Sequence, residues 1–235
     1  MKTFKQYITE SDEVIDHDEK FNKEQWLSNR RYKINADGTI DIIGDAALEM
    51  YSTLTKLPFN FGRVTGNFLC QNNNLATLEG APKIVGGDFI CATNKLTSLE
   101  GAPKIVGGDF ICHNNKLITL EGSPEKVHGD FICFNNQLTT LKGSPKWVGK
   151  MFDCYSNFLT SLQYAPVYIG GTFDCEANKI ANLNYLPEHI GNRILISGAH
   201  RNFTEEEIQQ AIEQHRHKKT LSHDDEMPDV GDIFD

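Results

Sequence analysis

Residues 89–96 read Phe-Ile-Cys-Ala-Thr-Asn-Lys-Leu. The alternation at the start of this stretch predicts a short strand in which Phe89 and Cys91 point inward and Ile90 points outward. Asn94 follows the strand, and its side-chain amide is expected to satisfy backbone groups of adjacent turns that a sharp bend leaves unpaired. The stretch therefore predicts one strand and one corner of a larger repeating structure.

The same pattern returns every 21 residues along the chain. It places cysteines at Cys70, Cys91, Cys112, Cys133, Cys154 and Cys175, and asparagines at Asn73, Asn94, Asn115, Asn136, Asn157 and Asn178. Leucines recur at Leu78, Leu99, Leu120, Leu141, Leu162 and Leu183, and prolines at Pro82, Pro103, Pro124, Pro145, Pro166 and Pro187. A period near 20 residues predicts a solenoid in which each turn is stabilised by its neighbours.

The unit resembles the LxLxxNxL signature of leucine-rich repeats, with Phe and Cys at the first two Leu places. The resemblance implies a leucine-rich repeat solenoid of short parallel strands with a concave strand face. Within the unit, residues 100–103 (Glu-Gly-Ala-Pro) predict a turn, and Gly107-Gly108 allows the chain to bend into the next strand. Turns and short 3₁₀ pieces are therefore expected on the convex side.

The segments around the repeat define the expected organisation. Residues 31–60 predict an N-terminal cap, which is a β-hairpin around Ala36-Asp37-Gly38 that covers the open edge of the solenoid. Residues 61–195 are expected to form the leucine-rich repeats. A capping box at Thr204 opens a capping helix within residues 196–220.

The two terminal segments are polar. Residues 11–30 are expected to be a polar linker or short helix. Residues 221–235 carry six acids and no Lys or Arg, which predicts a disordered acidic tail.

The six cysteines are predicted to form an inward stack of small apolar side chains. A thiolate nucleophile would need an electropositive, exposed setting, and a metal cluster would need CxxC or Cys/His pairs that converge on one point. The spacing offers neither arrangement. We therefore expect reduced thiols in the core and no metal.

The net charge of -9 disfavours wholesale binding to nucleic acids or anionic membranes. Residues 61–195 hold eleven basic and eleven acidic residues, so the acidity lies in the flanks, and no basic stripe is apparent in the sequence. No apolar run is long enough for a membrane span, and the first ten residues lack the apolar stretch of a secretory signal. A soluble protein made in the cytoplasm, with no direct nucleic-acid or membrane partner, is expected.

Outward strand positions form columns across the predicted repeats. One column reads Leu69, Ile90, Ile111, Ile132, Asp153 and Asp174, and the next reads Gln71, Ala92, His113, Phe134, Tyr155 and Glu176. The predicted partner-binding residues are Ile90, Ile111, Ile132, His113, Phe134, Tyr155, Asp88, Asp109 and Asp130. They form an apolar and aromatic patch rimmed by acids, which is typical of a protein-binding surface.

A structural interpretation of the patch is also open. β-Branched residues suit a strand, and near-identical repeats could have copied them without any selection for contact. Phe134 and Tyr155 favour binding, because they break the repeat instead of following it.

The sequence does not predict an enzyme. His113 and His128 lie in different parts of neighbouring repeats and lack a paired nucleophile or an orienting carboxylate. No Walker loop, strand-linked GxGxxG or HExxH motif occurs. No catalytic residue and no cofactor is therefore expected.

Residues 1–10 read Met-Lys-Thr-Phe-Lys-Gln-Tyr-Ile-Thr-Glu. They resemble the capsid-targeting peptide of internal head proteins in T-even-like tailed bacteriophages, which begins MKT-aromatic, continues with an aromatic-Ile pair and ends in an Ile/Leu-x-Glu cleavage site. The resemblance implies docking in the prohead core and cutting by the phage maturation protease between Glu10 and Ser11. It departs from the family in charge, because packaged internal proteins are often basic. An ordinary amphipathic helix or a frayed end is the other interpretation.

The repeat region also looks like leucine-rich repeat proteins of unassigned role in phage genomes. Together the resemblances imply a phage-encoded binding protein, packaged in the head or expressed on infection, that inhibits a host defence protein through its concave face. Its expected location is the virion interior and then the host cytoplasm. The alternative is a structural virion component without an inhibitory role.

Overall fold

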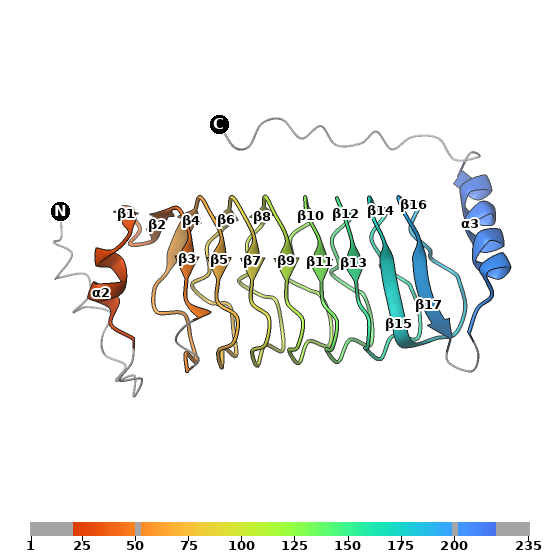
Figure 1. Ribbon diagram of the computed structural model, residues 1–235, viewed down its shortest axis with the longest axis horizontal. Helices are drawn as coiled ribbons and strands as arrows, with labels where there is room; N and C mark the ends of the chain where they lie inside the picture. The colour runs from red at the N-terminus through yellow and green to blue at the C-terminus, as the bar shows by residue number, and fades with distance from the viewer. Residues whose placement is uncertain (1–20, 50–52, 199–201, 220–235) are drawn as a thin grey trace.

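The computed structural model describes residues 21–49, 53–198 and 202–219. The repeats form a parallel β-solenoid of about seven turns, and each regular turn contributes one short strand to each of two sheets. In Figure 1 the turns follow one another along a nearly straight line, with a helix at each end. The face expected to be concave is the outer face of one of these two sheets.

Sheet A has nine strands and sheet B has eight. Sheet A contains β1 (Arg31–Ile34), β2 (Ile40–Ile43), β4 (Phe61–Val64), β6 (Ile84–Val85), β8 (Ile105–Val106), β10 (Lys126–Val127), β12 (Trp147–Val148), β14 (Tyr168–Ile169) and β16 (His189–Ile190). Sheet B contains β3 (Ala46–Ala47), β5 (Phe68–Leu69), β7 (Phe89–Ile90), β9 (Phe110–Ile111), β11 (Phe131–Ile132), β13 (Phe152–Asp153), β15 (Phe173–Ile180) and β17 (Ile194–Gly198). The helices are α2 (Lys23–Ser28) and α3 (Glu205–Lys219).

The register of both sheets follows the 21-residue step of the sequence. Phe89 of β7 pairs with Phe110 of β9, and Val85 of β6 pairs with Val106 of β8. The strands of sheet B confirm the predicted parallel strands. Beyond the N-terminal hairpin, sheet A is an addition to the predicted strands, because its strands, such as Ile105–Val106, lie in the arm for which only turns and short 3₁₀ pieces are expected. Between residues 61 and 198 the rest of that arm consists of turns and bends, so the expectation of 3₁₀ pieces is wrong there.

The core of the regular turns is built from columns of recurring side chains, of which the phenylalanine and cysteine columns are fully buried. The phenylalanines of sheet B stack along the axis, with ring centroids of Phe110 and Phe131 5.1 Å apart and their planes 4° from parallel. The six cysteines lie beside this column and are buried and free of disulfides, as predicted. Burial raises the pKa of the Cys91 and Cys133 thiols, which keeps them protonated at neutral pH.

Six buried asparagines form the predicted hydrogen-bonded column, here called the asparagine ladder. In each turn from Asn94 onward the amide nitrogen donates to the carbonyls of its own turn and to a cysteine carbonyl of the preceding turn. For Asn115 the acceptors are Cys112 and His113, and Cys91 of the turn before. The amide oxygen of Asn115 accepts from the backbone N–H of Leu96 at 3.0 Å. The ladder therefore joins successive turns through groups that the corner would leave unpaired.

The N-terminal hairpin is present, with β1 antiparallel to β2. Parallel stacking starts earlier than the sequence predicted, because β2 also pairs with β4, and β3 pairs with β5. The end of sheet B is covered by α2, where the indole nitrogen of buried Trp26 donates to the carbonyl of Ala47 at 2.9 Å. The cap is therefore a hairpin on sheet A and a helix on sheet B.

At the other end, α3 confirms the predicted capping helix. Glu207 accepts from the backbone N–H of Thr204, and the Thr204 hydroxyl accepts from the backbone N–H of Glu207, which is the predicted capping box. Ile208, Ala211 and Ile212 pack against the end of the core. The predicted acidic tail, residues 221–235, and the segment 1–20 lie outside the described residues.

Candidate functional site

The candidate site is the outer face of sheet B, made by three outward positions in each of six successive turns. These positions are Asn67, Leu69, Gln71, Asp88, Ile90, Ala92, Asp109, Ile111, His113, Asp130, Ile132, Phe134, Met151, Asp153, Tyr155, Thr172, Asp174 and Glu176. Strand pairing sets the middle column in register, so that Ile90, Ile111 and Ile132 lie side by side and Asp153 and Asp174 continue the column. We call this set the sheet B face.

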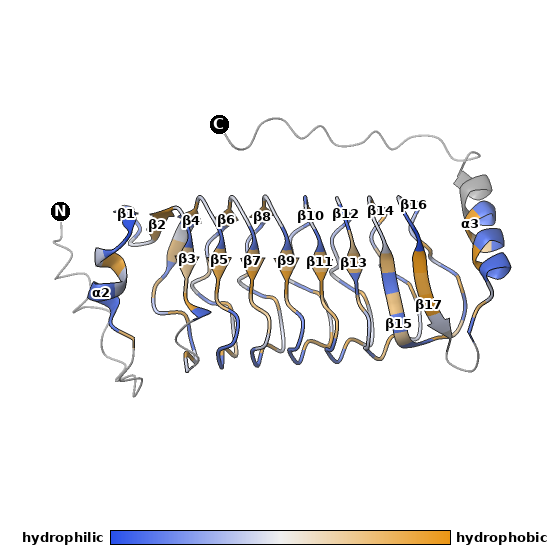
Figure 2. Cartoon of the chain, viewed as in Figure 1, coloured by the Kyte–Doolittle hydropathy of each residue, from blue (hydrophilic) through white to orange (hydrophobic). Residues whose placement is uncertain are grey.

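The three isoleucines are only half-buried, because each is packed between its neighbours of the same column. Figure 2 shows hydrophobic colour on the adjacent strands β5, β7, β9 and β11, and hydrophilic colour within β15. Ala92, in the neighbouring column, is buried with 3% of its surface exposed. The apolar part of the face is therefore a strip of half-buried isoleucines beside the buried Ala92.

The predicted aromatic residues come together on this strip. The rings of His113 and Phe134 are stacked in parallel, with centroids 4.3 Å apart, and Tyr155 follows in the next turn with 42% of its surface exposed. Burial lowers the pKa of His113, so the stacked imidazole is neutral at neutral pH. The structure thus places all six apolar and aromatic members of the predicted patch on one face.

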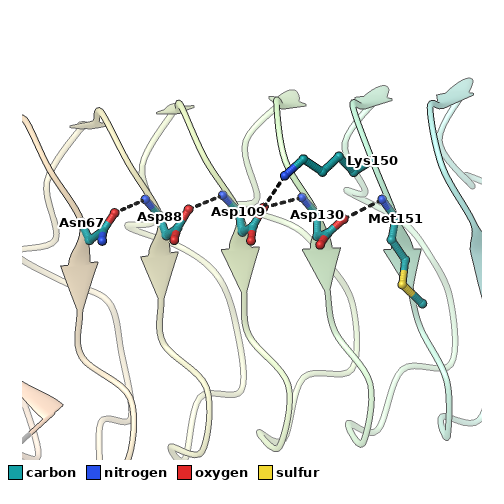
Figure 3. Close-up of polar contacts among 6 residues, drawn as sticks. All are labelled: Asn67, Asp88, Asp109, Asp130, Lys150 and Met151. Carbon is teal, nitrogen blue, oxygen red and sulfur yellow. Dashed lines mark hydrogen bonds and ion pairs between the residues drawn. The ribbon is translucent and has the colours of Figure 1, made fainter.

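The predicted acidic rim has a structural task as well. Figure 3 shows a row in which each side chain accepts the backbone N–H of the next turn: Asp88 from Asp109, Asp109 from Asp130 and Asp130 from Met151, each at 2.8 Å. The row begins one turn earlier, where the Asp45 carboxylate accepts from the backbone N–H of Asn67 at 2.7 Å, and the Asn67 side chain in turn accepts from that of Asp88. The Lys150 amine lies 4.0 Å from Asp109. The strand pattern alone did not predict this row, which we call the aspartate ladder. It uses one oxygen of each carboxylate.

Two further carboxylates lie at the C-terminal end of the face. Asp153 and Asp174 are paired residues on β13 and β15, and each accepts a hydrogen bond from the backbone N–H two residues later. Burial, together with the charge of Asp174, raises the pKa of Asp153 to about 6. Burial also raises the pKa of Asp174. Sequence analysis had placed both residues in the column without assigning them a role.

Residues 61–195 contain equal numbers of acidic and basic residues, but part of this charge is separated between the two sheets. The sheet B face carries six acids and no Lys or Arg. On sheet A, cations occupy the outward strand position or the residue before it in successive turns: Arg63, Lys83, Lys104, Lys126 and Lys146. Glu125 and Glu188 share these positions, and Glu125 forms an ion pair with Lys146 at 2.8 Å, so sheet A is rich in cations without forming a purely basic stripe. A count along the chain does not show this, because it does not tell on which side a residue lies.

Sheet A also carries an aromatic column that sequence analysis did not find. The rings of Trp147, Tyr168 and His189 stack in succession, with centroids 5.5 and 4.4 Å apart, and the Lys126 amine lies 4.3 Å from the Trp147 ring centroid. The 21-residue spacing of these three residues is the sequence signal that could have indicated this column. The stacked rings cover each other's faces, so this column can be explained by packing between turns.

Among the described residues no three His, Cys, Asp or Glu side chains are grouped so that they could hold a metal ion. None of the helices in the described ranges combines the length and apolar character needed to cross a membrane. The predicted cleavage site between Glu10 and Ser11 lies outside the described residues.

No protein-family model and no curated protein matches this chain in sequence. The case for a function therefore depends on the geometry of the sheet B face.

Proposed function

We propose that the protein is a protein-binding module that uses the sheet B face to occupy its partner. The observation that carries the proposal is the group His113, Phe134 and Tyr155, which breaks the repeat on a rigid sheet beside an apolar strip. Large rings held on a fixed scaffold contribute contact area at little entropic cost, and aromatic residues are enriched in protein interfaces. Backbone ladders on both sides of the face hold it in place before a partner arrives.

In more detail, we propose a leucine-rich repeat protein of a tailed bacteriophage that binds and inhibits a host defence protein. Support for the repeat class comes from the buried leucine and asparagine positions of the LxLxxNxL resemblance. Support for the phage origin comes from two sequence resemblances, that of residues 1–10 to capsid-targeting peptides and that of the repeat region to repeat proteins in phage genomes. A structural virion component remains the second candidate, and it is separated from the first by the packaging experiment below.

The binding proposal predicts that Phe134→Ala/Tyr155→Ala reduces partner capture at least tenfold. The test is affinity capture from infected cells with the full chain as bait, followed by quantitative mass spectrometry. Tyr164→Ala/Tyr185→Ala is the matched control, because both tyrosines are more than half exposed and lie in turns outside sheet B. Equal capture by wild type and Phe134→Ala/Tyr155→Ala, or equal loss in both double variants, would contradict the proposed face.

The packaging proposal predicts that purified phage particles contain this chain beginning at Ser11. Peptide mass spectrometry of particles identifies the N-terminus and gives the copy number. A fixed, high copy number would favour the structural component, whereas a low and variable number would favour an injected protein. An intact Met1 in particles, or no chain in them, would defeat the packaging idea and leave the binding face untouched.

A further inference from the structure

The sheet B face changes character along the axis of the solenoid. Its middle column runs from the half-buried strip Ile90, Ile111 and Ile132 directly into Asp153 and Asp174. Adjacent strands of a sheet lie about 4.8 Å apart, so an extended ligand along the axis would meet a new residue of the column at each strand. The face thus offers apolar contact first and negative charge next.

The negative end has a neighbouring cation, Arg193, but forms no ion pair with it among the described residues. Within the described part of the chain no ion pair joins Asp153 or Asp174 to a Lys, Arg or His side chain. The charged groups around the pair are Glu176, on β15 with Asp174, and Arg193, which acts on Asp174 from the turn before β17. The Cys154 and Cys175 thiols beneath the pair are held neutral by burial, which raises their pKa.

We propose that the sheet B face binds a basic segment of a protein partner, with aliphatic side chains over the isoleucine strip and a Lys or Arg over Asp153 and Asp174. The inference rests on the proposed function and specifies the partner's chemistry. Charge complementarity carries it, since the eighteen outward positions include six acids and no Lys or Arg. The same acids repel phosphates, which excludes a nucleic-acid strand from this face. Phe134 and Tyr155 can add contacts between a cation and a ring.

The proposal determines how binding depends on pH. A partner cation favours the ionised form of both carboxyls, so binding lowers their pKa from the raised values of the free protein. Affinity is therefore full above about pH 7 and is lost as the pH falls through about 6, the pKa of Asp153. At about pH 5 a carboxyl of pKa about 6 is about nine-tenths protonated, which corresponds to a loss of about tenfold in affinity.

The test uses the full chain and a fluorescent peptide with leucine at alternate positions of one half, arginine at alternate positions of the other half and serine between them, so that leucines and arginines project from the same face of the extended peptide. A length of about eight residues is chosen, since eight extended residues cover about five or six strands. Fluorescence anisotropy is expected to show saturable binding at about pH 7.5 that weakens about tenfold at about pH 5. Peptides with glutamine or glutamate in place of arginine are expected to bind at least tenfold more weakly. Equal binding of all three peptides would overturn the proposal.

Asp153→Asn/Asp174→Asn is expected to weaken binding of the arginine peptide at least tenfold at about pH 7.5 and to abolish the pH dependence. The fold should survive, because burial makes these carboxyls unfavourable when ionised and amides remove that cost. Glu205→Gln/Glu206→Gln on α3 is the charge-matched control, since it removes the same net charge outside the sheet B face. A similar loss in both double variants would mean nonspecific attraction to an acidic protein and would overturn the proposal.

Two further outcomes separate this inference from the proposed function. Suppose that Phe134→Ala/Tyr155→Ala abolishes partner capture while Asp153→Asn/Asp174→Asn does not affect peptide binding. The proposed binding face is then supported, and the proposal of a basic partner segment is overturned. If the protein alone self-associates in sedimentation experiments and Lys83→Glu/Lys104→Glu on sheet A prevents this, the occupant is a second copy. That result would also overturn the proposal of a basic partner segment.

Discussion

Replacing Asn115 with alanine is expected to lower the free energy of unfolding by about 3 kcal/mol. The substitution removes four hydrogen bonds in the middle of the asparagine ladder. The four losses differ in their energetic cost. The carbonyls of Cys91 and Cys112 each keep the amide of another ladder asparagine, Asn94 and Asn136, whereas the amide oxygen of Asn115 is the partner of the buried Leu96 N–H.

The main cost of Asn115→Ala therefore comes from one backbone N–H that is buried without a partner. Such a group costs about 1–3 kcal/mol, and three weakened carbonyl contacts add to it. Urea unfolding followed by circular dichroism measures the change, provided that the slope with urea stays constant. Lys116→Ala, at the next and exposed position, should change the free energy by less than about 0.5 kcal/mol.

Asn115→Asp separates the two roles of the side chain. The carboxylate can still accept from the Leu96 N–H, but its second oxygen faces the carbonyls that the amide nitrogen had bonded. We expect it to be at least as destabilising as alanine, because a buried charge meets only acceptors there. A loss below about 1 kcal/mol for both variants would show that the ladder does not hold the turns together.

The parts of the fold that sequence predicted are those that one repeat unit determines by itself. Alternation fixed the inward positions of Phe89 and Cys91, and the corner after the strand gave Asn94 its task. From β6 onward sheet A was missed because its strands are two residues long, and Ile105–Val106 shows no alternation that could distinguish a strand from a returning arm. A strand this short is recognised only when its neighbours are stacked on it.

The candidate site was predictable in its columns but not in its interactions. Strand periodicity placed Ile111, Phe134 and Asp109 on one face, since it tells which way a residue points. It does not tell that the Asp109 carboxylate reaches the N–H of Asp130 in the next turn. The separation of acids on sheet B from cations on sheet A was hidden for a similar reason, because both sheets had to be located before charges could be assigned to sides.

Phe131→Ala is expected to lower the free energy of unfolding by about 3–5 kcal/mol. The ring is fully buried and lies between Phe110 and Phe152, with centroids 5.1 and 5.4 Å away. Truncation removes contacts on both faces of the ring and leaves a cavity that identical neighbouring turns, fixed by their own ladders, cannot easily close. Phe158→Ala, at an exposed phenylalanine outside the core column, should change stability by less than about 0.5 kcal/mol.

The distance over which the phenylalanine column acts can be measured with a double-mutant cycle, using leucine in place of alanine so that the chain stays folded. Phe110 and Phe131 touch, so each substitution removes part of what the other would lose. The double variant should therefore be less destabilised than the sum of the singles, by about 1 kcal/mol. Phe68 and Phe131 are three turns apart, about 14 Å at about 4.8 Å per strand, and their effects should add to within about 0.5 kcal/mol. Coupling of equal size in both pairs would contradict a solenoid in which each turn is stabilised only by its neighbours, because nearest-neighbour contacts cannot transmit an energetic effect across two intact turns.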